Sequence, residues 1–149
     1  ERIMSEFRKQ SDSFYASPQV TQQEISEAAA MGIALVVNNR PDDEAPGQPA
    51  SADIEAATRA AGMDYLAIPV GSSGFSEPQV EKLQDALAAA QGPVLGFCRS
   101  GTRSTLLWAL AQARTGEDPE TIGAAAADAG YDVAPVRPAM DMFAARARG

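Results

Sequence analysis

The stretch "VLGFCRSGTRSTLLWAL", residues 94–110, joins a short apolar run to a helical pattern through a loop of small and basic residues. Cys98, the only cysteine of the chain, begins that loop. The apolar run is typical of a buried strand, and we expect a helix over residues 103–114. Open α/β sheets bind ligands at the carboxyl ends of their strands, where this loop lies. The stretch therefore predicts an α/β fold with a ligand site at Cys98.

The rest of the sequence alternates short apolar runs with alanine-rich helical patterns, which is typical of a parallel sheet covered on both faces. The expected strands are residues 14–17, 33–39, 64–70 and 93–97. Helices are expected at residues 22–31, 52–61, 77–90, 103–114, 120–129 and 137–149. Thr21 with Glu24 forms a capping box, and Ser51 and Ser76 are predicted N-caps. We expect one three-layer domain over residues 1–149 with about four parallel strands, in which residues 1–12 form an N-terminal extension.

The composition narrows the classes of partner and of chemistry. Of the 149 residues, 20 are acidic and 12 are basic, and this net charge of −8 argues against nucleic acid or an anionic membrane as a partner. One cysteine and no histidine exclude a disulfide within the chain, a Cys/His zinc site and histidine-based acid–base catalysis. We expect no metal and no cofactor. The sequence shows no hydrophobic signal region and no membrane-length apolar run, so we expect a cytoplasmic protein, where a free thiol stays reduced.

The Cys98 loop has the composition of an anion-binding cradle. Backbone N–H groups of a tight loop converge with those of the following helix N-terminus and stabilise negative charge. Gly101 permits a positive φ, and the small residues Ser100 and Thr102 allow the amides to approach closely. Helix N-termini and adjacent cations favour the thiolate form of cysteine. We therefore expect Cys98 to be a nucleophile and not a small buried hydrophobe.

Four polar residues near Cys98 are candidates for the same site. Arg103 is expected to fold over the cradle and to bind an oxyanion such as phosphate, sulfate or thiosulfate. The Ser104 hydroxyl is expected to hydrogen-bond the thiolate or a leaving sulfur. Arg99 is expected to point outward and to set the local potential. Arg40 ends a predicted strand at the same sheet edge and either contacts substrate or pairs with the acidic residues that follow it.

These motifs carry a family resemblance. The loop "FCRSGTRS" resembles the active-site loops of cysteine-dependent phosphatases and of rhodanese-type sulfurtransferases. Residues 12–138, with the paired motifs "NNRPD" and "CRSGTRS", resemble the DUF442 family, the phosphatase-like domain of beta-lactamase-hydrolase-like proteins. The resemblance implies a dual-specificity-phosphatase-like fold. Its members occur alone or fused to persulfide dioxygenase domains, which implies a role in sulfur metabolism and a persulfide dioxygenase partner.

The sequence departs from the phosphatase pattern in three ways. Cys98 and Arg103 are separated by four residues, whereas the phosphatases that this loop resembles have five, and rhodanese-type loops share the shorter length. Phe97 stands where those phosphatases have histidine. The loop at residues 71–75 lacks the aspartate that protonates the leaving group. Transfer of sulfur needs no such acid, because sulfite and thiolates leave readily.

The main hypothesis from the sequence is a rhodanese-type sulfurtransferase. In it, Cys98 takes sulfur from thiosulfate or a small persulfide and passes it to a thiol or to cyanide. The alternative is a phosphatase with a phosphocysteine intermediate, for which Asp42, Asp43 or Glu44 supplies the acid; among these Asp43 is the candidate. A third hypothesis is a non-catalytic anion-binding or redox-sensing module, although the chain has no second cysteine to resolve an oxidised thiol. The expected partner is a small sulfur donor or a phosphorylated substrate.

Overall fold

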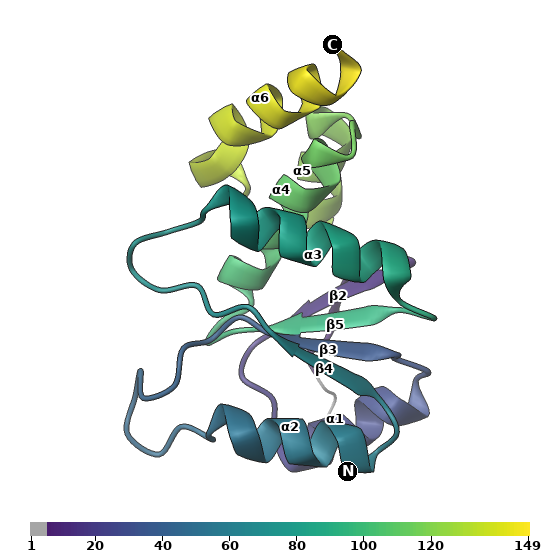
Figure 1. Ribbon diagram of the computed structural model, residues 1–149, viewed down its shortest axis with the longest axis vertical. Helices are drawn as coiled ribbons and strands as arrows, with labels where there is room; N and C mark the ends of the chain where they lie inside the picture. Colours follow the sequence, from purple (N-terminus) through teal and green to yellow (C-terminus); the bar gives the residue numbers. More distant parts are fainter. Residues whose placement is uncertain (1–5) are drawn as a thin grey trace.

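A five-stranded sheet lies between two layers of helices in the computed structural model, which describes residues 6–149 (Figure 1). The strands are β1 (Arg8–Ser11), β2 (Phe14–Ser17), β3 (Leu35–Asn38), β4 (Asp64–Ala67) and β5 (Val94–Phe97). Their order across the sheet is β1-β2-β5-β3-β4. The last four in this order are parallel, and β1 pairs antiparallel with β2. The α/β fold with four parallel strands is therefore confirmed, with one additional edge strand.

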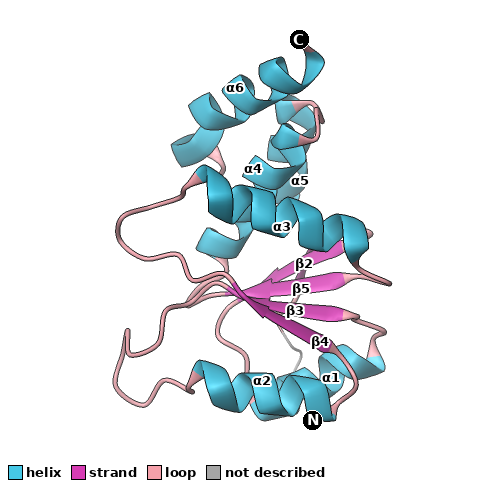
Figure 2. Cartoon of the chain, viewed as in Figure 1, coloured by secondary structure: helices cyan, strands magenta, loops and turns pink. Residues whose placement is uncertain are grey.

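The helices cover the two faces of the sheet unequally (Figure 2). One face is covered by α1 (Gln22–Ala30) and α2 (Ser51–Ala60). The other side carries α3 (Glu77–Ala89), α4 (Thr102–Arg114), α5 (Pro119–Asp128) and α6 (Arg137–Arg148), with a short 3₁₀ helix at Ala134–Val136. None of the helices in residues 6–149 has the length and apolar character needed to cross a membrane.

Two of the three predicted helix caps are confirmed. Thr21 and Glu24 form the expected capping box at α1, and Ser76 begins α3 with its amide donating to Oε1 of Gln79 at 2.8 Å. The prediction for Ser51 is wrong, because the N-cap of α2 is Ala50 and Ser51 is already helical. A side chain from the preceding loop, that of Asp42, binds this helix end instead.

The expected N-terminal extension is wrong for residues 8–11, because they form β1, and its first five residues lie outside the described part of the chain. In this strand Arg8 lies opposite Ala16 and Lys9 opposite Tyr15. Only one side chain of the strand is buried, that of Gln10. A short polar strand at a sheet edge buries too little apolar surface to show the alternating pattern of an amphipathic strand.

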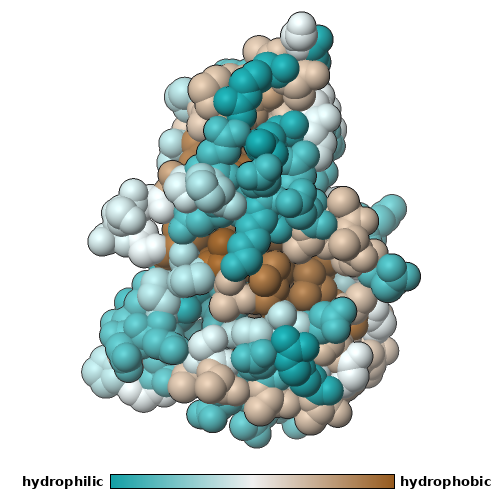
Figure 3. All heavy atoms as spheres, in the orientation of Figure 1, coloured by the Kyte–Doolittle hydropathy of each residue, from teal (hydrophilic) through white to brown (hydrophobic). Residues whose placement is uncertain are grey.

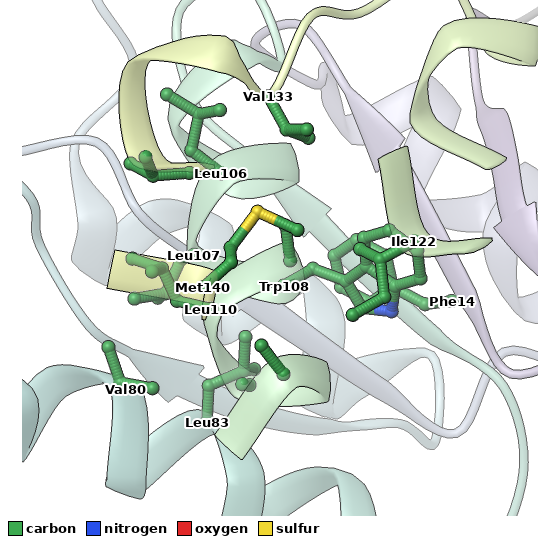
Figure 4. Close-up of a cluster of buried hydrophobic side chains, with 14 of the residues drawn as sticks. Phe14, Val80, Leu83, Leu106, Leu107, Trp108, Leu110, Ile122, Val133 and Met140 are labelled. Carbon is green, nitrogen blue, oxygen red and sulfur yellow. The ribbon is translucent and has the colours of Figure 1, made fainter. Parts of the chain in front are cut away.

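The larger core cluster surrounds α4, which is buried on most of its circumference. Figure 4 shows its side chains pointing toward one another, with Trp108 stacked on Phe14 at a ring-centroid distance of 5.8 Å. Leu106, Leu107 and Leu110 are buried as their helical spacing predicts. On the surface, Figure 3 shows an apolar band across the middle of this face, between hydrophilic regions above and below it. The buried side chains of α4 anchor this helix in the core, and its N-terminus lies at the sheet edge.

The four parallel strands end at the same level. Ser17 of β2 and Asn38 of β3 both pair with Phe97 of β5, and Asn38 also pairs with Ala67 of β4. The loops after these strands therefore meet at one edge of the sheet. That edge is where such folds place their ligands.

Candidate active site

Cys98 follows the central strand β5 directly, and its side chain is fully buried. Its Sγ accepts a hydrogen bond from the backbone N–H of Gly101 at 3.1 Å. Gly101 is the N-cap of α4, so the sulfur lies at the positive end of a helix. The backbone of Cys98 is held in turn by a bond from its N–H to the carbonyl oxygen of Ser17 at 3.3 Å. The structure thus places the buried thiol against one backbone donor, the N–H of Gly101, at the start of α4.

Glycine at position 101 is required by conformation and by space. Its φ is +93°, a region that residues with a Cβ rarely adopt. A Cβ built there would lie 2.1 Å from the hydroxyl oxygen of Tyr131. The tight turn that aims the Gly101 amide at sulfur is therefore open only to glycine.

Arg103 is fixed beside the cradle by a bidentate ion pair with Glu44. Its Nη1 and Nη2 donate to the two carboxylate oxygens at 2.7 and 2.9 Å, and Nη1 also donates to the carbonyl oxygen of Val70 at 2.7 Å. The hydrogen bonds with Glu44 raise the pKa of Arg103, burial opposes them, and the nearby Cys98 adds to the increase. Arg103 therefore adjoins Cys98 with its orientation set in advance of any ligand.

Glu44 has a positioning role that the sequence did not reveal. Besides Arg103, it binds Nε of Arg40 at 3.0 Å, and Nη1 of Arg40 donates to Gln19 at 3.0 Å. The hydrogen bond from Arg103, with a further contribution from Arg40, lowers the pKa of Glu44 to about 2 against the opposing effect of burial. Glu44 is ionised at neutral pH and is not available as an acid. Arg40, only 6% exposed, pairs with this acidic residue, which is one of its two predicted roles.

The prediction that the Ser104 hydroxyl hydrogen-bonds the thiolate is wrong. Its Oγ donates to Oδ1 of Asn39 at 2.7 Å, and Nδ2 of Asn39 donates to the carbonyl oxygen of Ile68 at 2.9 Å. A serine hydroxyl has one proton to donate, and here Asn39 accepts it. Ser104 therefore links α4 to the residues that follow β3 and β4.

The remaining loop residues face outward. Arg99 is exposed, as expected, and so are Ser100 and Thr102. The Oγ of Ser100 donates to Oγ1 of Thr102 at 3.1 Å. The backbone N–H of Thr102 also donates to Oγ of Ser100, at 3.4 Å. The carbonyl oxygen of Ser100 accepts a hydrogen bond from Tyr131 at 3.1 Å, a contact across 31 residues for which the sequence carries no signal.

The acidic loop between β3 and α2 separates its three carboxylates. Asp42 accepts a hydrogen bond from the backbone N–H of Ser51 at 2.8 Å and so takes the role predicted for a serine cap of α2. Glu44 is held by the two arginines. Asp43 is exposed and has a φ of +64°, so it remains the candidate acid of this loop.

We expect the ion pairs of Glu44 to stabilise the folded protein in a pH-dependent way. A carboxylate with a lowered pKa contributes stability above its unfolded value, here about 4.5, and this contribution is lost as the pH falls toward about 2. Glu44→Gln should therefore be less stable than the unmodified protein at pH 7, and the difference should shrink below pH 4.5. Urea denaturation of both proteins across this pH range measures it. A difference that stays constant with pH would show that the charge of Glu44 is not the cause.

The fold is shared with solved structures of phosphatases. The chain superposes on the solved structure of kinase associated phosphatase, a protein studied with its catalytic-site cysteine changed to serine, with a TM-score of 0.72 over 91% of this chain and 86% of that one. Their sequences are 14% identical, which shows the fold alone. A protein from Neisseria meningitidis, described as a phosphatase candidate, is 31% identical with a TM-score of 0.82, over 94% of this chain and 99% of that one. The fold is that of the cysteine phosphatases.

The chain belongs to the family described as the phosphatase-like domain of beta-lactamase hydrolase-like protein, whose model matches residues 6–115. The family predicted from the sequence is therefore confirmed. A beta-lactamase hydrolase-like protein of Agrobacterium fabrum is 41% identical over 88 residues, which are 59% of this chain and 20% of that protein. The chain thus spans about a fifth of the length of the curated relatives it matches.

Proposed function

We propose that the chain is a cysteine-dependent phosphatase that hydrolyses phosphate monoesters through a phosphocysteine at Cys98. The observation that carries this proposal is the buried Sγ of Cys98, which accepts the Gly101 amide at the N-terminus of α4 with Arg103 locked beside it. Membership of a phosphatase-like family and the similarity to solved phosphatases support it further. They favour the alternative from the sequence analysis over sulfur transfer.

The reaction has two displacements at phosphorus. The thiolate of Cys98 attacks the phosphorus atom, an S–P bond forms, and the P–O bond to the leaving group breaks with its electron pair on that oxygen. Water then attacks phosphorus, the S–P bond breaks, and phosphate is released with the thiolate restored. The amides at the start of α4 and the guanidinium of Arg103 stabilise the charge on the phosphoryl oxygens in both steps.

Glu44 and Asp42 do not supply a general acid for the leaving group. The loop at residues 71–75 contains no acid, Glu44 is ionised, and Asp42 accepts a backbone hydrogen bond at α2. We therefore infer that substrates whose leaving groups depart unprotonated are preferred. Aryl phosphates belong to this class, and simple alkyl phosphates do not.

We expect the value of kcat/KM to fall steeply as the pKa of the leaving group rises. A general acid contributes about 10²- to 10⁴-fold to such reactions, and alkyl phosphates should be slower than aryl phosphates by at least that factor. A series of substituted phenyl phosphates, compared with an alkyl phosphate, measures the dependence. A flat dependence would show that an acid acts after all; a further loss in Asp43→Asn, confined to poor leaving groups, would identify it as Asp43.

Sulfur transfer is a second candidate, and the short loop favours it. Four residues separate Cys98 from Arg103, and an outer sulfur atom needs less room than a phosphoryl group. In this reaction Sγ attacks the outer sulfur of thiosulfate, an S–S bond forms, and sulfite leaves with the electron pair of the broken bond. Incubation with thiosulfate followed by intact-protein mass spectrometry tests it, because the persulfide adds the mass of one sulfur atom to a chain with a single cysteine.

A further inference from the structure

Tyr131 reaches the Cys98 loop from a distant part of the chain. It follows α5, and its hydroxyl donates to the carbonyl oxygen of Ser100 at 3.1 Å. Arg8 of the edge strand β1 lies over the tyrosine ring at 5.5 Å and donates to the carbonyl oxygen of Ala129 at 3.0 Å. Arg8, near the start of the described chain, thus packs on the tyrosine that contacts the loop.

The acceptor of that hydrogen bond belongs to the same peptide unit as the donor to sulfur. The carbonyl of Ser100 and the N–H of Gly101 share one trans peptide plane, in which the two groups point in opposite directions. Tyr131 binds the carbonyl side at 3.1 Å, and Sγ of Cys98 accepts the N–H on the other side at 3.1 Å. Rotation of this peptide would break both hydrogen bonds together.

We propose that Tyr131 is a positioning residue, whose hydroxyl fixes the Ser100–Gly101 peptide so that its N–H stays directed at the sulfur of Cys98. The role rests on the proposed function only in taking the Cys98 thiolate as the reacting group. The close packing of the hydroxyl on the loop supports this role, because even a methyl group at Gly101 would collide with the tyrosine oxygen.

The protonation state of Tyr131 suits a donor. Burial raises its pKa above 10.0, Arg8 opposes this increase, and the charge of Cys98 adds to it. The hydroxyl therefore keeps its proton at neutral pH. Arg103 of α4 also interacts with Cys98, and it is itself paired with Glu44.

Tyr131→Phe tests the proposal, since it removes the hydroxyl and keeps the ring. Titration of the ultraviolet absorbance of the thiolate, with the same variant carrying Cys98→Ser as the blank, gives the midpoint pH of thiolate formation. We expect this midpoint to rise by roughly half to one pH unit, which is the effect of losing one ordinary hydrogen bond. Tyr15→Phe is the matched control, because within residues 6–149 its hydroxyl makes no hydrogen bond to the loop.

An unchanged midpoint in Tyr131→Phe, or an equal rise in Tyr15→Phe, would overturn the positioning role. The titration needs no substrate, so its result is independent of whether phosphate is hydrolysed. A raised midpoint in a protein that releases no phosphate would leave the role of Tyr131 intact and reject the proposed function. Phosphate release with an unchanged midpoint would do the reverse.

Discussion

Cys98→Ser abolishes phosphate release and leaves the fold in place, if the account is correct. The serine hydroxyl is a far weaker nucleophile than a thiolate at neutral pH, and the cradle has no histidine to activate it. We expect kcat with an aryl phosphate to fall by at least about 10⁴-fold. The serine oxygen retains the Gly101 amide as a donor, so stability should stay within about 2 kcal/mol of the unmodified protein. Steady-state assays and urea denaturation measure the two effects.

The stability measurement is the control for this variant. A loss of turnover in a protein that still unfolds cooperatively at a similar urea concentration assigns the effect to chemistry. Turnover that survives in Cys98→Ser would reject both the phosphatase and the sulfurtransferase mechanism, because each forms its covalent bond at this sulfur.

Arg103→Lys is expected to have the next largest effect. Lysine keeps the charge but not the planar fork that binds two carboxylate oxygens of Glu44 and leaves further donors for an anion. Loss of one well-placed donor to a developing oxyanion costs about 10²- to 10³-fold in kcat. We expect a decrease of that size in kcat/KM for aryl phosphates, measured with the same substrates as above.

Two further variants test whether the loss of activity is specific to Arg103. Arg114→Lys changes the same residue type on the same helix, but Arg114 binds Glu77 and Gln84, so kcat/KM should stay unchanged. Glu44→Gln keeps Arg103 but weakens its support, and we expect a smaller loss, about 10-fold. An equal loss in the Arg114 and Arg103 variants would contradict a local role for Arg103.

Local chemistry explains which parts of the fold are predictable from the sequence. The capping box of Thr21 and Glu24 involves neighbours in the chain, and the apolar run before Cys98 is long enough to mark a buried strand. Gly101 is predictable because a tight turn with a positive φ restricts the residue type. The Cys98 loop and the first turn of α4 lie within seven consecutive residues, 98–104.

The parts that escape prediction depend on contacts between distant residues. Glu44 and Arg103 are 59 residues apart, and Tyr131 meets Ser100 across 31 residues. The Ser104 hydroxyl donates to Asn39, the buried residue that follows β3, and no local pattern reveals this contact. An acidic run therefore looked like a source of catalytic acids, although one of its members orients the arginine.

The choice between the two reactions also differs between local sequence features and comparisons over most of the chain. The short loop and the missing acid are local features, and they favoured sulfur transfer in the sequence analysis. The comparisons draw on most of the chain, and the family match and the 31% identical solved structure support the proposed phosphatase. Both proposed reactions require the same kind of substrate, one whose leaving group departs without a proton.

Intact-protein mass spectrometry of the acid-quenched reaction with an aryl phosphate tests the central claim most directly. The account predicts a transient species heavier by one phosphoryl group, absent in Cys98→Ser and lost as free phosphate appears. With one cysteine in the chain, the mass gain needs no further assignment beyond that control. No phosphoryl adduct, together with the gain of one sulfur atom from thiosulfate, would contradict the phosphatase and establish sulfur transfer in its place.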